Sequence, residues 1–113
     1  MTDLLITTWT DVCALTDLLP GRGAAALVSE HEVALFRWDG DTVYAVSNLD
    51  PFSQASVMSR GIVGSRGDVP KVASPIFKQN FDLRTGACLD DPAVALLTFP
   101  VRVVGGRVEV GSP

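Results

Sequence analysis

The sequence predicts an all-β domain, an antiparallel β-sandwich or partly open barrel with two proline-containing loops at one end. Eight or more short apolar runs are separated by turn residues at regular spacing, which is typical of such folds. Asp39-Gly40-Asp41 and Gly105-Gly106 stand between apolar runs, as hairpin turns do. Two loops, Asp50-Pro51-Phe52 and Ser74-Pro75-Ile76-Phe77, interrupt the strand pattern and bracket the middle of the chain.

Length and composition limit the number of domains and the classes of partner. Its 113 residues have room for one domain, which we place at residues 5–111, and a hydrophobic fraction of 47% is ample for one core. The formal net charge of −4 and the isoelectric point near 4.7 argue against a nucleic-acid or anionic-membrane partner, because either would need a basic face. An acidic surface suits a protein partner.

The N-terminal half reads as strands joined by short turns. Ile6–Trp9 has the β-branched and aromatic residues of a first strand, and Thr10-Asp11 offers turn or cap chemistry after it. We expect one helical turn within Ala14–Leu19, which Pro20-Gly21 ends. Three consecutive strands are then expected at Ala24–Val28, Val33–Trp38 and Thr42–Val46.

The C-terminal half follows the same pattern after a looser stretch. The spacing of Gly61, Gly64 and Gly67 suggests a flexible hairpin or excursion between the two proline-containing loops. Further strands are expected at Val69–Ala73, at Phe81–Leu83 and Ala87–Leu89 around a turn at Arg84–Gly86, and at Thr98–Val104 and Arg107–Val110.

Three short motifs invite functional interpretations that the context does not favour. Gly21-x-Gly23 has no strand before it and no helix after it, so a plain turn is expected rather than a phosphate cradle. His31, flanked by two glutamates in a polar turn, is expected to be solvated. Arg66-Gly67-Asp68 is expected to be a turn rather than an adhesion motif.

The two cysteines carry no recognisable motif. Cys13 and Cys88 lie far apart with no CxxC spacing, so we expect two buried, reduced thiols, although a disulfide between them stays open. The N-terminal segment lacks the basic start and long apolar run of a secretory signal, which favours the cytoplasm. No apolar run approaches the roughly 18 residues that span a bilayer.

Several of these features together resemble the Rieske [2Fe-2S] ferredoxin fold over nearly the whole chain. The matching residues are Trp9, Arg37, Gly40, Val43 to Val46, Asn48, both proline-containing loops, Phe81-Asp82-Leu83-x-x-Gly86 and the final hairpin. The resemblance implies two loops that hold a cluster, one through Cys-x-His and the other through Cys-x-x-His, with two thiolates on one iron and two imidazoles on the other.

All four of those ligands are replaced here. Aligned with the family, the two cysteine positions hold Asp50 and Ser74, and the two histidine positions hold Phe52 and Phe77. A phenylalanine has no lone pair for a metal, and a serine hydroxyl is a poor substitute for a thiolate on iron. We therefore expect these to be vestigial cluster positions, with no metal, no cofactor and no catalytic residue in this chain.

Two longer strings narrow the resemblance. NLDPFSQASVMSRGIVG (48–64) and SPIFKQNFDLRTGACLDDP (74–92) resemble the small subunits of assimilatory NAD(P)H-dependent nitrite reductase. That resemblance implies an accessory role beside a large subunit that carries FAD, an iron-sulfur cluster and siroheme and reduces nitrite to ammonia. A Rieske-type electron carrier with unusual ligands and a free-standing binding module on the same scaffold stay open.

The loop side chains have two interpretations. Leu49, Phe52, Ile76 and Phe77 are expected to crowd the place of the lost cluster, where the two phenylalanines pack on each other as filler. The alternative is an apolar tip that docks on the large subunit, with Arg60 and Lys78 as its polar rim.

Overall fold

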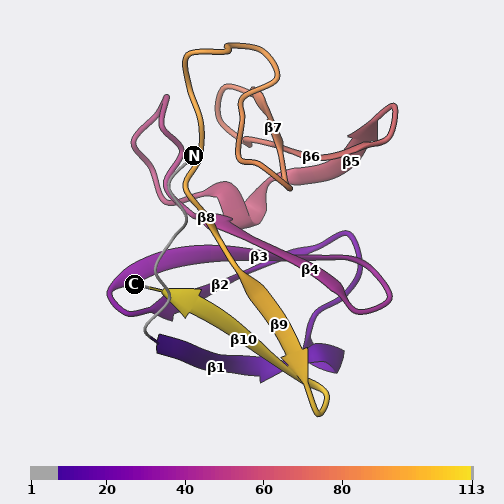
Figure 1. Cartoon of the computed structure of the whole chain (residues 1–113). Helices are drawn as coiled ribbons and strands as arrows, with labels where there is room; N and C mark the ends of the chain where they lie inside the picture. The colour runs from indigo at the N-terminus through magenta and orange to yellow at the C-terminus, as the bar shows by residue number, and fades with distance from the viewer. Residues whose placement is uncertain (1–7, 113) are drawn as a thin grey trace.

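Three antiparallel sheets make up the computed structural model, which describes residues 8–112 (Figure 1). The terminal sheet has the order β1-β10-β9, the central sheet β2-β3-β4-β8 and the loop sheet β5-β6-β7. Single 3-10 turns, η1 (Leu15–Asp17) and η2 (Met58–Arg60), are the helical elements of this part of the chain. The expected all-β class is confirmed. Residues 5–7, within the expected domain and partly within its first strand, lie outside the described residues.

The strands are short, and most lie where the apolar runs are. They are β1 (Thr8–Ala14), β2 (Gly23–Val28), β3 (His31–Asp39), β4 (Thr42–Ser47), β5 (Ile62–Arg66), β6 (Val69–Ala73), β7 (Asn80–Asp82), β8 (Thr98–Phe99), β9 (Val101–Val104) and β10 (Arg107–Ser112).

The central sheet is covered on both faces. Val33 and Leu35 of β3 enter a core cluster shared with the terminal sheet, whereas Ala34 and Phe36 enter a second cluster under the loop sheet. Successive side chains of a strand point to opposite faces, so a strand covered on both sides is apolar at every position, as Val33 to Phe36 are. The loop sheet thus packs on a central sheet whose two faces are both buried.

Three expectations about strand limits were wrong. Thr10 and Asp11 lie inside β1, whose register shifts between Asp11 and Cys13, so the polar pair marks a bulge rather than a turn. Pro100 divides the expected strand of residues 98–104 into β8 and β9, which belong to different sheets, because proline has no N–H for the ladder. Residues 87–89 form only isolated bridges.

Several turns contain residues with positive φ, at glycines and at one pair of polar residues. Gly105 and Gly106 have φ of 56° and 76°, as a type I′ hairpin turn needs. Gly86 has φ of 80°, and a Cβ there would lie 2.1 Å from the Leu96 carbonyl oxygen. The expected four-residue polar turn after β2 is only two residues long, Ser29 and Glu30, with φ of 46° and 73°.

Arg66-Gly67-Asp68 closes the β5–β6 hairpin, as expected of a turn. Arg66 pairs across the surface with Asp90 at 3.4 Å, and Gly67 has φ of 60°. Of the two alternatives expected for this stretch, a flexible hairpin or an excursion, the structure has a hairpin.

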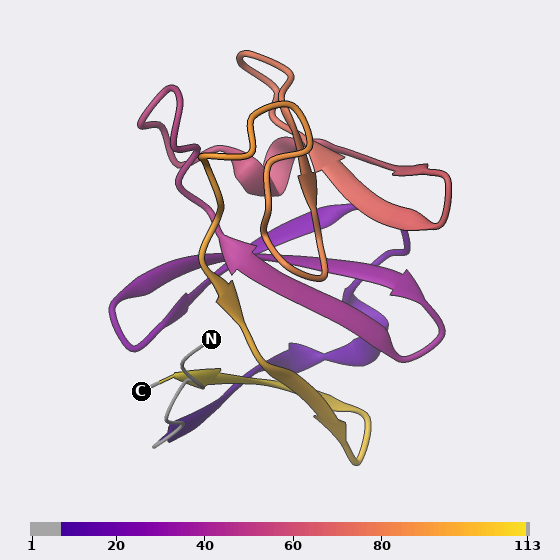
Figure 2. The same ribbon diagram turned by 45° about the horizontal axis from the view of Figure 1, so that its top comes forward.

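The two ends of the described chain lie together, far from the loops. Thr8 pairs with Ser112 in the terminal sheet. This sheet lies at the bottom of the view in Figure 2, and the loops project at the top. In the described residues, no helix has the length and apolar character needed to cross a membrane.

Candidate functional site

Two loops project side by side at one end of the molecule (Figure 2). Loop 1, residues 49–56, follows β4 and is closed at its base by a bridge between Leu49 and Ser56. Loop 2, residues 74–79, joins β6 to β7 and is closed by a hydrogen bond from the Ser74 N–H to the Gln79 carbonyl at 3.0 Å. These are the two proline-containing loops that the sequence singled out.

A buried side-chain hydrogen bond joins the two loops. Ser74 Oγ donates to Asp50 Oδ2 at 2.5 Å, and the two residues are 1% and 0% exposed. They occupy the two positions that correspond to cysteines in the resemblance described above. The sequence analysis missed the bond, and its only signal was that each loop begins with a small polar residue before proline.

The two loops have the same local design. Asp50 Oδ1 accepts the Phe52 N–H at 2.9 Å, and Ser74 Oγ accepts the Ile76 N–H at 3.3 Å, each from two residues further along. Four residues after each of these side chains, Gln54 and Lys78 have φ of 62° and 64°. Left-handed conformations are strained for residues other than glycine, so the surrounding contacts hold both loops in shape.

Asp50 is held as a carboxylate. Burial raises the pKa of this carboxyl, but hydrogen bonds from the Ser74 hydroxyl, the Phe52 N–H and Ser53 more than offset burial and keep the pKa below its usual value. Both carboxylate oxygens are therefore already engaged within the protein.

Asn48 fixes the base of loop 1. This residue is 2% exposed, and its Nδ2 donates to Glu32 Oε1 at 3.1 Å and to the Ser56 carbonyl at 3.3 Å. Its Oδ1 accepts the Ser59 N–H at 2.7 Å, which ties η2 to the same point. One buried amide thus connects β3, loop 1 and η2.

The two phenylalanines have different environments, and the expectation that they pack on each other was wrong. Phe52 is partly buried, packs against the core cluster under the loop sheet and lies 6.2 Å from Phe81 between ring centroids. Phe77 is 56% exposed. Phe52 therefore fills space in the core, as the first interpretation expects, whereas Phe77 does not.

The outer surface of the loops carries exposed apolar side chains. Leu49 and Ile76 are 41% and 43% exposed, and Lys78, beside Phe77, is exposed and makes no ion pair with any residue in 8–112. We call Leu49, Ile76, Phe77 and Lys78 the loop face. Arg60 is exposed at the end of η2. That these residues bind a partner remains a prediction.

Leu97 is a further exposed apolar residue near loop 1. It is 55% exposed, and its carbonyl accepts the Ser47 N–H at 2.8 Å, two residues before Leu49. The sequence analysis did not identify it, because the end of an apolar run gives no sign of which side chain remains outside.

The cysteines lie away from the loop face. Cys13 is partly buried against the core cluster of the terminal sheet, whereas Cys88 is buried in the other cluster, and both are free thiols. Burial raises the pKa of the Cys13 thiol. No group of three or more histidine, cysteine, aspartate or glutamate side chains that could hold a metal occurs within residues 8–112.

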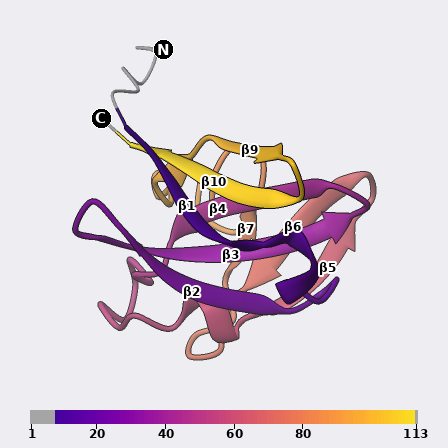
Figure 3. The same ribbon diagram turned by 90° about the horizontal axis from the view of Figure 1, so that it is seen from below.

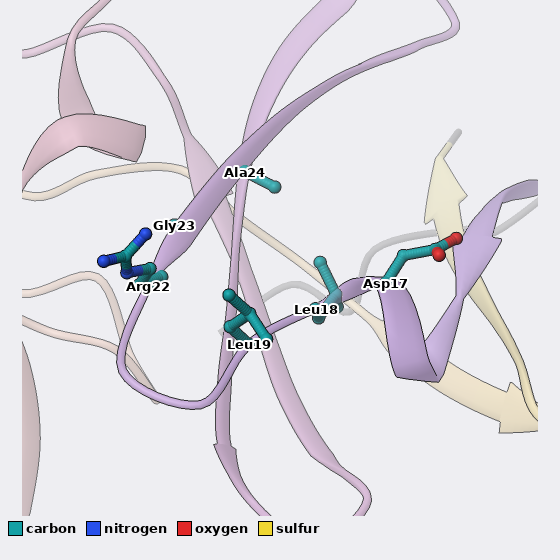
Figure 4. A pocket seen from close by; sticks show the side chains of 6 residues that line it. All are labelled: Asp17, Leu18, Leu19, Arg22, Gly23 and Ala24. Atoms are coloured by element: carbon teal, nitrogen blue, oxygen red, sulfur yellow. The ribbon is translucent and has the colours of Figure 1, made fainter.

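A small pocket between η1 and the start of β2 lacks the converging polar groups of a binding site. It measures about 110 Å³ and is lined by residues 17–19 and 22–24 (Figure 4). Its charged side chains, Asp17 and Arg22, point away from each other, so no polar groups converge there. Gly21, with φ of 79°, is the turn residue that the sequence predicted.

Known proteins share this fold and sequence. The model of the Rieske-like [2Fe-2S] domain matches residues 8–111. The nitrite reductase (NADH) small subunit of Escherichia coli K12 is 40% identical over 103 residues, which cover 90% of this chain and 95% of the relative. The crystal structure of the small subunit of an NADH-dependent nitrite reductase from Mycobacterium tuberculosis is 52% identical with a TM-score of 0.90, covering 94% and 96% of the two chains.

A third relative places the same domain inside a longer chain. The nitrite reductase [NAD(P)H] large subunit of Klebsiella oxytoca is 42% identical over 104 residues, which are 92% of this chain but 11% of the relative. From the family model, the small-subunit relatives and the shared fold, we conclude that this chain belongs to the Rieske-like domain family and, within it, to the small subunits of NAD(P)H nitrite reductase.

Proposed function

We propose that this chain is an accessory subunit of a nitrite reductase that holds no cluster of its own and docks through its loop face on the large subunit. The Asp50–Ser74 hydrogen bond supports the absence of a cluster, and the exposed apolar side chains of the loop face support docking. The hydrogen bond occupies the two loop positions from which thiolates would reach an iron. A buried carboxylate and hydroxyl that bond to each other are poor substitutes for the two thiolates that a [2Fe-2S] cluster needs.

The other two ligand positions fit a cluster no better. Phe52 packs inward against Phe81, and Phe77 has no lone pair to give. Cys13 and Cys88 belong to separate core clusters, so neither thiol replaces a missing ligand without unpacking a core. The hydrogen bond between Asp50 and Ser74 holds the two loops together, as a metal bound by both loops would.

The partner is a nitrite reductase large subunit. The Klebsiella relative supports this choice, because a domain alike in sequence is part of a chain of that name. The redox groups, FAD, an iron-sulfur cluster and siroheme, belong to the large subunit, which reduces nitrite to ammonia in cytoplasmic nitrate assimilation. The small chain contributes to assembly or modulates electron transfer, since it has no nucleophile-base pair or metal cluster of its own among the described residues.

Two experiments test this function. Anaerobically purified small chain is expected to be colourless, and stoichiometric iron and acid-labile sulfide would establish an electron carrier instead. Co-expression with the large subunit is expected to yield a stable complex, while the small chain alone neither oxidises NAD(P)H nor reduces nitrite. A colourless chain that never binds the large subunit would indicate a free-standing binding module.

A further inference from the structure

One outer strand of the described chain lacks the sequence features that usually protect a sheet edge. β2, Gly23–Val28, is an outer strand of the central sheet and pairs only with β3 (Figure 3). Its sequence, GAAALV, has no charge and no proline, and its register with β3 shows no bulge. Proteins usually blunt such edges with charges, prolines, bulges or short strands, because unpaired backbone groups recruit other strands.

The other outer strands all carry such a device. β1 has a bulge and the charged Asp11, and β9 carries Arg102. β7 and β8 have only three and two residues. β5 ends in Arg66. β2 differs from all of them, and its Leu27 is 70% exposed.

The backbone groups that β2 leaves free follow from its hairpin. Val28 and His31 flank the two-residue turn and therefore exchange both hydrogen bonds, so Val28 and every second residue before it bond to β3. The Glu32 carbonyl accepts the Asn48 N–H at 2.9 Å on the far side of β3, which agrees with this phase. The N–H and C=O groups of Ala25 and Leu27 thus face the free edge, whereas Gly23, at the start of the strand, packs against the Ser59 carbonyl of η2.

Charges at the two ends of β2 select one pairing. If two copies of β2 run antiparallel about a twofold axis at Ala26, Ala25 lies opposite Leu27 of the second copy, and the free backbone groups match. Beyond the ends of the paired strands, the same register brings Arg22 toward Glu30 of the second copy, and the reverse. Both side chains are exposed, and neither makes an ion pair within residues 8–112. A shift of two residues keeps the hydrogen bonds but separates these charges.

We propose that two copies of this chain associate through their β2 edges in this register, which joins the two central sheets into one continuous sheet. The exposed Leu27 of each copy is covered by Ala25 of the other, and an Arg22–Glu30 ion pair closes each end. The inference is independent of the proposed docking, since it concerns the small chain alone.

Amide hydrogen exchange tests the backbone pairing directly. In the monomer, the N–H groups of Ala25 and Leu27 face water and exchange quickly, whereas those of Ala24 and Ala26 bond to β3. Raising the protein concentration is expected to slow exchange at Ala25 and Leu27, with Ala24 and Ala26 as the internal control. Fast exchange at Ala25 and Leu27 in a sample shown to be dimeric would overturn the proposal.

Charge reversal tests the register by sedimentation equilibrium at low salt. Arg22→Glu and Glu30→Arg each turn two attractive pairs into two repulsive ones, so each is expected to weaken the dimer about tenfold. The double variant is expected to restore it. Asp41→Arg, an exposed reversal in the β3–β4 turn with the same charge change as Glu30→Arg, is the control and should leave dimerisation unchanged.

Three outcomes would count against this pairing. A strictly monomeric chain up to about 1 mM would refute it, and protection of Ala25 and Leu27 only in the complex would assign the edge to the large subunit. A double reversal that stays as weak as the single variants would exclude the Arg22–Glu30 register. Equal urea midpoints for all variants would confirm that the reversals do not act through folding.

Discussion

Ser74 Oγ donates a hydrogen bond to Asp50 Oδ2 across 24 positions of sequence, and both residues are almost completely buried. The bond joins two loops that otherwise extend from different sheets. It also explains why both buried positions are polar. A buried carboxylate is stable only when donors surround it, and the Ser74 hydroxyl is one of the donors that Asp50 has here.

Removing the donor should destabilise the domain. We predict that Ser74→Ala lowers the free energy of unfolding by about 2 kcal/mol, because it leaves a buried carboxylate oxygen without its partner. Urea denaturation monitored by tryptophan fluorescence measures the change. Ser65→Ala, at an exposed position of β5, is the matched control and should change stability by less than about 0.5 kcal/mol. Equal effects of the two substitutions would show that the bond contributes nothing.

Stability should fall in acid, in part through Asp50. The folded-state pKa of Asp50 lies below its unfolded value of about 3.9, so the carboxylate contributes stability above that value and loses it as the pH falls through the folded pKa. Asp82 acts in the same direction: burial raises its pKa, but Arg84, at 3.1 Å, and backbone N–H groups lower it further than burial raises it.

Asp50→Asn isolates the Asp50 contribution to this pH dependence. The difference in urea midpoint between wild type and Asp50→Asn should be largest above about pH 5 and shrink steadily below about pH 4, because protonation makes the wild-type side chain neutral as well. A difference that stays constant from pH 7 to pH 3 would mean that Asp50 does not titrate with folding.

The two loop phenylalanines should separate folding from binding. Phe52→Ala is expected to cost about 3 kcal/mol of stability, since it empties a site packed against Phe81. Phe77→Ala should leave stability within about 0.5 kcal/mol and weaken binding to the large subunit by about 2 kcal/mol, roughly 30-fold. Denaturation and titration calorimetry measure the two effects. Because Phe52 lies inward and Phe77 outward, their effects on stability should add.

Lys78 offers a second test of the loop face. Lys78→Glu is expected to weaken docking about tenfold when a carboxylate of the large subunit faces it, with no change in the dimerisation of the small chain. Arg22→Glu makes the same change of charge, but at the β2 edge rather than on the loop face. It is therefore expected to leave docking intact. Identical docking by wild type and Lys78→Glu would remove this residue from the interface.

Gly86 should be far less tolerant than Gly67, although both have positive φ. Alanine at Gly86 would place its Cβ 2.1 Å from the Leu96 carbonyl oxygen, whereas nothing lies within 4 Å at Gly67. We predict a loss of about 3 kcal/mol or more for Gly86→Ala and about 1 kcal/mol for Gly67→Ala. Thermal unfolding followed by circular dichroism distinguishes the two. Similar melting temperatures would mean that the chain near Leu96 yields readily.

Local patterns in the sequence predict most of the fold. Alternating and β-branched runs locate most strands, and Gly105-Gly106 locates a turn, because these features depend on neighbours along the chain. Pro100 carried a signal that would have divided the last long strand in two, since proline within a run marks an edge or a break. The misplaced turn at Thr10-Asp11 shows that a bulge and a turn share the same polar residues.

The candidate site is less predictable, because it depends on contacts between distant segments. Nothing in the local sequence indicates that Asp50 and Ser74 bond, or that loop 1 turns its phenylalanine inward while loop 2 turns its phenylalanine outward. The resemblance grouped the four positions in advance, and the structure joins two of them, Asp50 and Ser74, by a hydrogen bond. What each side chain does there depends on packing against residues such as Phe81, which lies in another strand.

The pairing of Thr8 with Ser112 lets the domain be rewired. A short glycine-serine linker could join these ends, and new ends could be opened at the exposed β3–β4 turn without disturbing either loop. Such a circular permutant would keep the Asp50–Ser74 bond and the loop face. For the same reason, fusing this domain to another protein at either end would put the tether on the side away from the loop face.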